Sequence, residues 1–396
     1  MIDTPLLIGV TGHRDLNDES YQMAKNQVHS FLKNLQERIP NTPIRLMSGL
    51  ADGADRLVAW TALELGISVQ AVLPMPVKMY EKDFSNESLQ EFKKLIDNDN
   101  VELLELSVPA DIDSSKAEAF GPERDALYAQ LGEHLIQSSS ILIALWDGSN
   151  NDLTGGTSDV VLRYLNAGGS GNDAAVNFLD NVDVQAIGSE FVFWVPVKRI
   201  SNDNISEVPV STNPLFVTGN LGPNTLRIQE SMPDDLKLQI GRLNSYNNEY
   251  TEIVDQGKFF TWGGMLDKLP DAKTHSEYPM LKALDDEYQK ADGLALFNQK
   301  YSDRQFKLFG YMAALMGLLF LFYAKILAAK VFLIGYLALF LAGLWMFRIT
   351  DKKHWFSRHL MQRVIAETLS VRFYFILEGI DKQVDVDKIL DLTGVR

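Results

Sequence analysis

The feature that most constrains the fold of this 396-residue chain is a pair of apolar segments toward its C-terminal end. Residues 308–324 and 331–347 each run for 17 residues without a charge, and the connector 325–330 (KILAAK) separates them. A helix of this length covers about 25 Å, close to the roughly 30 Å hydrocarbon core of a bilayer. The alternative is a buried helical hairpin in a soluble protein. We favour a two-helix transmembrane hairpin within residues 304–350, with membrane lipid as its partner.

The charges around this hairpin predict its orientation. The positive-inside rule places the side that is richer in Lys and Arg in the cytoplasm. Nothing in the first residues has the basic and apolar regions of a signal peptide. We therefore expect a multi-pass protein of the inner (plasma) membrane with two spans and both termini cytoplasmic. Seven basic residues flank the spans outside (Lys300, Arg304, Lys307, Arg348, Lys352, Lys353, Arg358), against two between them (Lys325, Lys330).

The first 200 residues predict an α/β domain. Short apolar runs alternate with helix-like stretches, and most runs are continuously apolar, as is typical of parallel strands covered on both faces. This order predicts a Rossmann-like, doubly wound parallel sheet, in which ligands bind at the carboxyl ends of the strands. The expected strands are 6–10, 44–47, 69–73, 101–106, 141–146 and 191–197, and the expected helices are 19–38, 55–65, 89–96, 123–137 and 158–165.

The rest of the chain predicts three further parts. A Gly-rich stretch at 167–175 and an Asn-, Ser- and Pro-rich stretch at 201–224 lead into weakly amphipathic helical segments such as 278–288. We expect a loop and helical arm over 201–303, the hairpin over 304–350, and a C-terminal cytosolic helix within 351–396. Apolar residues at Leu360, Val364, Val371 and Phe375 give that last helix a stripe that would pack on a partner helix or the membrane surface.

Composition excludes several classes of function. The formal net charge is −15, and after residue 350 there are eight Lys or Arg against seven Asp or Glu, so the acidic excess lies in the first 350 residues. Such a surface disfavours nucleic acid as a partner. The chain has no cysteine, its six histidines are scattered, and no G-x-x-x-x-G-K-[ST] motif occurs. We therefore expect no metal site, no cofactor and no ATPase activity.

Three strand-to-helix loops carry the candidate ligand-binding residues. Glycines let a ligand approach the backbone, and the following helices offer free N–H groups to phosphate. Arg14 adds a fixed charge, and Asp55 caps its helix or accepts a hydrogen bond from a ribose. Because the three loops would converge on one cleft, we predict a nucleotide site there. Its residues are Gly12, His13 and Arg14 after the first strand, Ser48, Gly49, Asp52, Gly53 and Asp55 after the second, and Asp147, Gly155, Gly156 and Thr157 after the fifth.

Four stretches resemble the SLOG superfamily, over roughly residues 5–200. They read GVTGHRDL, SGLADGADRLVA, GPERDALYAQLGEHLIQSSSILIALWDG and GGTSDVV. That superfamily includes the Smf/DprA DNA-processing proteins, the LOG phosphoribohydrolases, nucleotide-sensing domains of bacterial conflict systems and the N-terminal domain of TRPM channels. The two spans and the sequence AETLSVRFYF resemble, more loosely, the two-transmembrane SLATT effectors that accompany such sensors.

The resemblance sets a sensor against an enzyme. LOG enzymes use a glutamate in the pattern G-G-x-G-T-x-x-E, and aligning Gly156 and Thr157 with its G-T places Val160 where that glutamate belongs. Valine cannot protonate a leaving base. Asp159 is one residue early and would point elsewhere on a helix. We therefore assign no catalytic residue, although Glu123 from another loop could substitute.

The leading hypothesis is a membrane-anchored antiphage effector of the abortive-infection type. Its SLOG-like domain would sense a signalling nucleotide, such as a cyclic ADP-ribose derivative or a cyclic oligonucleotide, made by a separate enzyme. Its hairpins would then permeabilise the inner membrane as a pore within a homo-oligomer. One alternative is a membrane-tethered nucleotide N-glycosidase, either a LOG-like phosphoribohydrolase or an NAD hydrolase. Another is a non-catalytic scaffold that the hairpin only localises.

Overall fold

The computed structural model divides into two compact units, an N-terminal unit that runs to Asn248 and a helical unit that begins at Glu249. The predicted features at 168–175 and 201–212, and the end of the chain after Glu378, lie outside the described residues. The structure describes residues 4–109, 112, 116–149, 155–167, 190–200, 213–219, 226–269, 275, 278–327 and 329–378.

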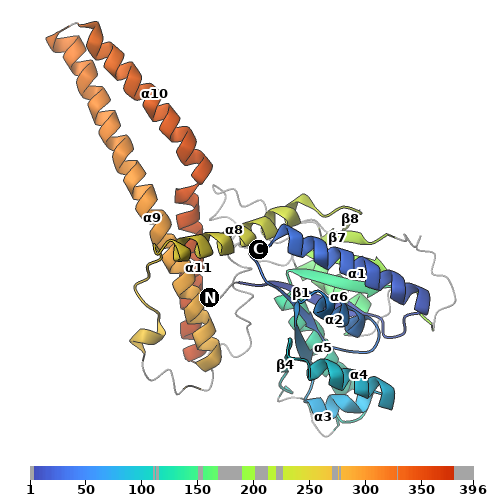
Figure 1. Cartoon of the computed structure of the whole chain (residues 1–396). Helices are drawn as coiled ribbons and strands as arrows, with labels where there is room; N and C mark the ends of the chain where they lie inside the picture. The colour runs from blue at the N-terminus through green and yellow to red at the C-terminus, as the bar shows by residue number, and fades with distance from the viewer. Residues whose placement is uncertain are drawn as a thin grey trace. The chain divides into compact units, whose positions relative to one another are not determined.

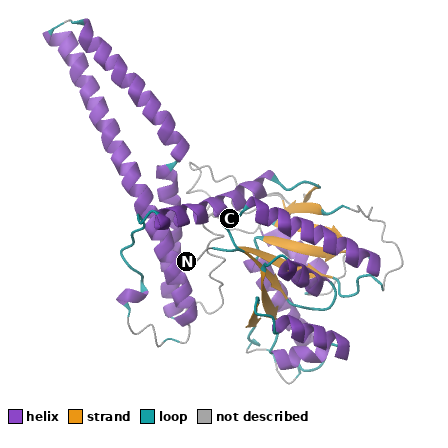
Figure 2. Cartoon of the chain, viewed as in Figure 1, coloured by secondary structure: helices purple, strands orange, loops and turns teal. Residues whose placement is uncertain are grey.

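An eight-stranded sheet forms the N-terminal unit, in the order β4-β3-β2-β1-β5-β6-β7-β8 (Figures 1 and 2). The first six strands are parallel and the last two pairings are antiparallel. The predicted doubly wound, mostly parallel sheet is therefore confirmed. The strands are β1 (Leu6–Gly12), β2 (Ile44–Ser48), β3 (Ser68–Leu73), β4 (Val101–Glu105), β5 (Ile141–Trp146), β6 (Phe191–Pro196), β7 (Leu215–Gly219) and β8 (Leu226–Gln229).

Helices cover both faces of this sheet because its strands present apolar side chains alternately to each side. On β6, Val192 and Trp194 join the cluster around α6, whereas Phe193 between them stacks on Phe31 of α1 with ring centroids 4.0 Å apart. The helices of this unit are α1 (Asp18–Arg38), α2 (Ala54–Glu64), α3 (Val77–Tyr80), α4 (Asn86–Ile96), α5 (Pro122–Ser138) and α6 (Thr157–Ala167), with the 3-10 turn η1 (Glu81–Asp83).

The N-terminal unit extends beyond the boundary predicted at residue 200. The strand β7 lies within a stretch that we expected to be a loop, and β8 lies within the expected helical arm. The five residues of β7, LFVTG, are enough for a strand because neighbouring strands on both sides supply its hydrogen-bond partners, and β8 forms the edge. The first part of α8 (Asp234–Asp255) also belongs to this unit, through Asn244 and Asn247.

The helical unit contains α9 (Tyr278–Leu321), α10 (Lys330–Lys353) and α11 (Trp355–Leu377), with the 3-10 turn η2 (Leu266–Lys268) before them. The predicted segment 278–288 and the first predicted span are one continuous helix, α9, which ends in a π-helical turn at Phe322–Ile326. Two helical segments, Tyr278–Ile326 and Lys330–Arg348, are long and apolar enough to cross a membrane, and their most apolar stretches are exposed. Within this unit α11 packs along α9.

Candidate functional site

The strand order brings the predicted site residues to one edge of the sheet. From β1 the chain proceeds through β2, β3 and β4 on one side, and β5 then pairs with β1 on the other. In open α/β sheets, ligands bind at the carboxyl ends of the strands where the order reverses, which here is between β1 and β5. Gly12, His13 and Arg14 follow β1, Ser48 and Gly49 lie at the end of β2, and Asp147 follows β5.

A buried histidine, His13, lies where the strand order reverses, between β1 and β5. The His13 Nε2 atom lies 3.0 Å from Asp147 Oδ1 and 3.2 Å from the Asp147 amide nitrogen, and the His13 side chain is buried. Burial lowers the pKa of His13, although the Asp147 carboxylate opposes this shift. Burial would raise the pKa of Asp147, but hydrogen bonds from the Ser149 hydroxyl and N–H hold it below its usual value.

Two glycines let neighbouring loops approach more closely than a side chain would allow. Gly53 has a φ of +75°, and a Cβ atom there would lie 2.3 Å from the carbonyl oxygen of Arg14. Gly155 also has a φ of +75°, and its Cβ atom would lie 2.9 Å from the backbone nitrogen of Ala129 on α5. The loop after β2 thus packs against the loop after β1, and the loop before α6 packs against α5.

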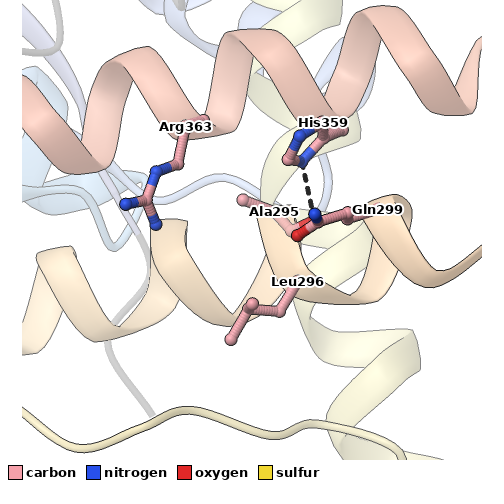
Figure 3. Close-up of a pocket in the computed structure, with 5 residues that line it drawn as sticks. All are labelled: Ala295, Leu296, Gln299, His359 and Arg363. Atoms are coloured by element: carbon pink, nitrogen blue, oxygen red, sulfur yellow. Dashed lines mark hydrogen bonds between the residues drawn. The ribbon is translucent and has the colours of Figure 1, made fainter. Parts of the chain in front are cut away.

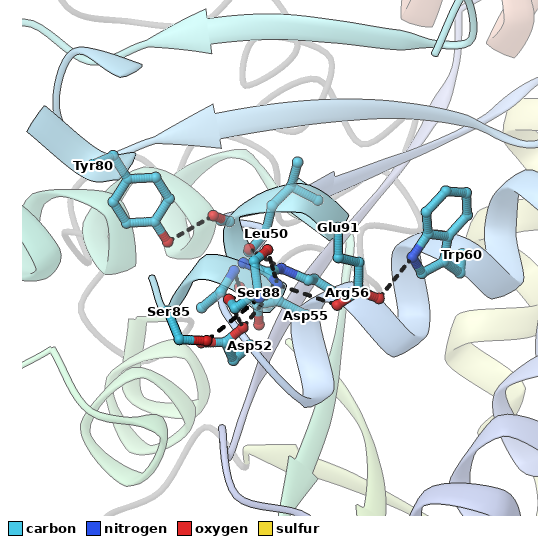
Figure 4. A network of polar contacts seen from close by, with 11 residues as sticks. Leu50, Asp52, Asp55, Arg56, Trp60, Tyr80, Ser85, Ser88 and Glu91 are labelled. Carbon is cyan, nitrogen blue, oxygen red and sulfur yellow. Dashed lines mark hydrogen bonds and ion pairs between the residues drawn. The ribbon is translucent and has the colours of Figure 1, made fainter. Parts of the chain in front are cut away.

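The loop after β2 is held by side chains at several of its backbone groups (Figure 4). The Tyr80 hydroxyl donates to the Gly49 carbonyl (2.9 Å), and Arg56 Nε donates to the Leu50 carbonyl (3.0 Å). The Leu50 N–H donates to the Ser48 hydroxyl (3.1 Å), and Leu50 itself has a φ of 52°, in the left-handed region. Ser48 is fully buried, so its hydroxyl shapes the loop.

Arg56 is the centre of the polar network in Figure 4 and is only 2% exposed. Its Nη1 atom lies 2.7 Å from Asp52 Oδ1 and 3.2 Å from Glu91 Oε2, and it donates to Ser88 at 2.9 Å. The guanidinium also lies over the ring of Phe84. The predicted site residue Asp52 is therefore paired with Arg56, whose contacts with Ser88 and Glu91 join α2 to α4. The sequence analysis quoted Arg56 within the motif but gave it no role.

Asp55 is the other buried charge of this loop. Its carboxylate accepts the Ala51 N–H at 3.3 Å and is 8% exposed. Burial raises the pKa of Asp55 to about 7, although the same hydrogen bond and the nearby guanidinium groups of Arg14 and Arg56 oppose the shift. Asp55 thus bonds within its own loop, and it lies close enough to Arg14 for that charge to lower its pKa.

Tyr128 of α5 lies beside Arg14 and Gly155, and it is linked to the loop after β2 through Tyr80. The Arg14 guanidinium, from the loop after β1, lies 5.3 Å from the centre of its ring. Tyr80, which holds the loop after β2, lies 6.2 Å from the same ring, and Gly155 packs against the Tyr128 backbone. The Tyr128 hydroxyl donates to Asp83, and burial raises its pKa to about 12. The sequence analysis missed Tyr128, which lies on a helix rather than in a Gly-rich loop.

A second buried arginine, Arg124, shares a hydrogen-bond partner with Tyr128. Arg124 lies one turn earlier on α5 and is 2% exposed. It donates to the carbonyl groups of Ala117 (2.7 Å) and Met79 (3.1 Å), and to Asp83 (2.7 Å), the same carboxylate that accepts the Tyr128 hydroxyl. The side chains that face the loops are therefore positioned by ion pairs inside the domain.

The start of α6 supplies the third loop. The Asp159 carboxylate accepts the Gly155 N–H at 2.9 Å, so Asp159 caps its own helix. The first intrahelical bond runs from the Val160 N–H to the Gly156 carbonyl at 3.0 Å, and the N–H groups of Thr157 to Asp159 cannot bond within the helix. Val160 itself is 2% exposed within the apolar cluster around α6. A glutamate at this position would lie in the core.

A separate cavity of about 320 Å³ lies in the helical unit, between α9 and α11 (Figure 3). Its walls include two polar side chains of α11, and both have partners. His359 Nδ1 lies 3.0 Å from the Ala295 carbonyl oxygen, so it donates this hydrogen bond, and Arg363 Nη1 lies 2.7 Å from Asp292. The remaining lining residues are Ala295, Leu296 and Gln299. No predicted site residue lines this cavity.

Comparison with known proteins gives only weak structural likeness. Among the residues that the structure describes, no group of three or more His, Asp or Glu could hold a metal ion. No protein-family model and no curated protein sequence matches the chain. The X-ray structure of DNA processing protein A (DprA) from Streptococcus pneumoniae is similar at a TM-score of 0.28 and 13% identity, over 41% of this chain and 48% of that one. The chain thus matches less than half the length of that protein, and a likeness at this level carries no argument about function.

Proposed function

We propose that the carboxyl edge of the sheet binds a nucleotide between the loops that meet at Tyr128. The observation that carries this proposal is that Arg14, Gly155 and Tyr80, which bonds the loop after β2, all lie beside one aromatic residue. Arg14 is exposed and offers a cation to a phosphate, and the positive end of the α6 dipole lies at this edge of the sheet. The resemblance of these loops to the SLOG superfamily supports the same ligand class.

The helical unit supports a role at the membrane. Two adjacent apolar helices, exposed along their most apolar stretches, are costly in water and favourable in a bilayer. The excess of flanking Lys and Arg favours an inner-membrane hairpin with both termini in the cytoplasm. A reporter fused after Arg396 and another at the N-terminus should both report cytoplasm. Opposite locations for the two ends would overturn the hairpin.

Together these parts support a membrane-anchored sensor and effector as the function of this chain. A signalling nucleotide, either a cyclic ADP-ribose derivative or a cyclic oligonucleotide, would bind the N-terminal unit and favour one assembly state of the hairpins. The hairpins would then permeabilise the inner membrane and stop phage propagation in the infected cell. The spans hold no ionisable side chain that would select ions, so we propose a leak of low selectivity.

Position 160 favours this proposal over the N-glycosidase alternative. The side chain that aligns with the catalytic glutamate of LOG enzymes belongs to the apolar core, and Asp159 is used as a helix cap. The full-length protein in detergent should therefore bind its nucleotide and release it chemically unchanged. Turnover that disappears with Glu123→Gln would reverse this assignment.

The decisive experiment begins with the ligand. Nucleotides that co-purify with the full-length protein from phage-infected cells are identified by mass spectrometry and titrated against the purified protein. Arg14→Ala should weaken binding about ten- to a hundredfold, since a charge-assisted bond contributes about 1.5–3 kcal/mol. Arg38→Ala is the matched control, because α1 carries Arg38 to the amino end of β2, at the opposite edge of the sheet. Equal affinities for the two variants would place the pocket elsewhere.

The same ligand then tests the effector. Full-length protein in dye-loaded liposomes should release dye when the nucleotide is added. Gly156→Glu should abolish this release, because a carboxylate at the start of α6 repels phosphate. Leakage that is independent of the nucleotide, or absent at saturating nucleotide, would contradict the link between the two units.

A further inference from the structure

The helix α11 is apolar on two opposite faces, and among the residues that the structure describes only one of these faces is covered. At 3.6 residues per turn the two faces lie about 180° apart. One face packs on α9 and consists of Ile365, Ala366, Leu369, Phe373 and Ile376, none more than 2% exposed. The other face, here called the outer stripe, consists of Phe356, Leu360, Val364, Val371, Tyr374 and Phe375, each 42–54% exposed. A helix that is apolar on both sides is expected to be covered on both.

The outer stripe has the spacing of a coiled-coil seam. Leu360, Val364, Glu367, Val371 and Tyr374 follow one another at intervals of four, three, four and three residues. In this register Val364 and Val371 occupy a positions, and Leu360 occupies a d position. A β-branched residue at a with leucine at d favours two parallel strands. The residues that face α9 fall at the b, c and f positions, so both contacts can exist at once.

We propose that the outer stripe of α11 pairs in parallel with the outer stripe of a second copy of this chain. Only His354 separates α10 from α11, so α11 begins at the same distance from the hairpin in every copy. In two chains whose hairpins cross one membrane, the stripes would start at the same height, run in the same direction and meet in register. The parallel direction therefore rests on the membrane insertion proposed above, whereas the pairing rests on the stripe alone.

Charge and area favour a second copy over the membrane surface. Glu367 lies on the same face of α11 as the outer stripe and is 2.5 Å from Arg363, one turn earlier. Against lipid both charges of this ion pair would be desolvated, whereas in a helix pair Arg363 lies at a solvated g position. The two Glu367 carboxylates would face each other at the d position, and the Arg363 beside each of them offsets this like-charge contact. Six half-exposed side chains bury on the order of 500 Å² per copy and about 1,000 Å² in total, which reaches the lower limit for a specific interface.

The absence of cysteine from the chain makes this pairing directly testable. Val364→Cys and Val371→Cys are made separately in the full-length protein and oxidised in native membranes. In a parallel pair each position meets its own counterpart, so each variant should form a disulfide-linked dimer by itself. Ala283→Cys is the matched control, because Ala283 is exposed on α9 and lies outside the stripe. We expect cross-linking at least about tenfold faster at 364 and 371 than at 283, because contact holds these residues at a high effective concentration.

Each outcome has a defined meaning. Homotypic cross-links at 364 and 371 support the proposal. Cross-links that form only when the two variants are mixed would overturn it in favour of an antiparallel pair, and rates equal to that of Ala283→Cys would overturn the pairing. The charged variant Val364→Lys with Val371→Lys should abolish cross-linking of Leu360→Cys while the circular dichroism stays unchanged. Recovery of the protein without detergent would count against the proposed membrane function alone. Cross-linking measures contact between the outer stripes, whereas the need for detergent measures membrane insertion of the hairpin.

Discussion

The two units of the chain bury polar groups in different places. In the N-terminal unit the buried charges Arg56 and Asp55 lie at a loop after a strand and bond its backbone. In the helical unit, buried Asn298 and Gln362 bond each other and Glu249 between helices. The Asn298 amide lies 2.8 Å from Glu249 Oε1 and 2.9 Å from Gln362 Oε1.

This difference indicates two roles for buried polar side chains: they fix the shape of a loop in the N-terminal unit, and they align helices in the helical unit. A loop has no hydrogen-bond ladder of its own, so side chains must satisfy its carbonyl groups if it is to keep one shape. Helices already satisfy their backbone, so a buried polar layer between them serves mainly to fix their register. The N-terminal unit should therefore lose ligand binding when a buried charge is removed, and the helical unit should lose alignment.

The largest expected effect is at Arg56. Arg56→Met removes the donor to the Leu50 carbonyl and leaves Asp52 and Glu91 without their cation. Breaking a buried ion pair costs about 3–5 kcal/mol, and the partial exposure of both carboxylates places this case at the lower end. Thermal unfolding of the full-length protein in detergent should show the loss, and nucleotide binding should disappear. Lys25→Met, at an exposed pair with Glu64, should change neither.

The second prediction concerns the pH dependence that Asp55 imposes. Burial raises the pKa of Asp55 to about 7, above its value in the unfolded chain. The folded state therefore binds more protons between about pH 4 and pH 7, and this contribution to stability is lost as the pH rises through 7. The loss is on the order of 2–4 kcal/mol. Asp55→Asn should remove that slope from plots of unfolding free energy against pH. Identical slopes for both proteins would show that Asp55 titrates normally.

The parallel sheet and the predicted loops could be found from the sequence because their signals are local. Apolar runs, most of them continuous, marked all six parallel strands, and the Gly-rich turns after the first, second and fifth strands marked the carboxyl edge. Two antiparallel strands escaped prediction. The stretch 201–224 is rich in Asn, Ser and Pro, so it hides the short run of β7, and β8 has only four residues. An edge strand of this length depends on a neighbour that sequence alone does not reveal.

The side chains that hold the site could not be predicted in the same way. The bonds that join Tyr80 to Gly49, Asp83 to Arg124 and Tyr128, and Arg124 to Met79 span between 31 and 45 residues of the sequence. Their positions depend on how the segment 77–96 and α5 pack at the carboxyl edge. A local motif shows which backbone a loop needs, whereas the residues that bond the loop are set by tertiary contacts.

The third prediction separates close approach from backbone strain. Gly53 and Gly66 have nearly the same φ, +75° and +72°, but a Cβ atom at Gly53 meets the Arg14 carbonyl, whereas nothing lies within 4 Å at Gly66. Gly66→Ala should therefore cost about 1 kcal/mol, from the left-handed conformation alone. Gly53→Ala should cost about 2–3 kcal/mol, since two loops must also move apart. Chemical denaturation measures both, and equal losses would mean that the loops do not need their close packing.

The smallest effect on nucleotide binding is expected in the helical unit and tests the other side of the comparison. Asn298→Leu removes a donor that Gln362 and Glu249 share, and should cost about 1–3 kcal/mol, because those acceptors stay partly buried. Adding Gln362→Leu removes one of the stranded groups, and Glu249 keeps Arg358 at 3.6 Å. The double variant should therefore be no less stable than Asn298→Leu, since apolar pairs of similar shape can replace buried polar pairs. Its nucleotide affinity should equal that of the wild type. A double variant that loses nucleotide binding would show that this polar layer supports the site, and the distinction between the two units would fail.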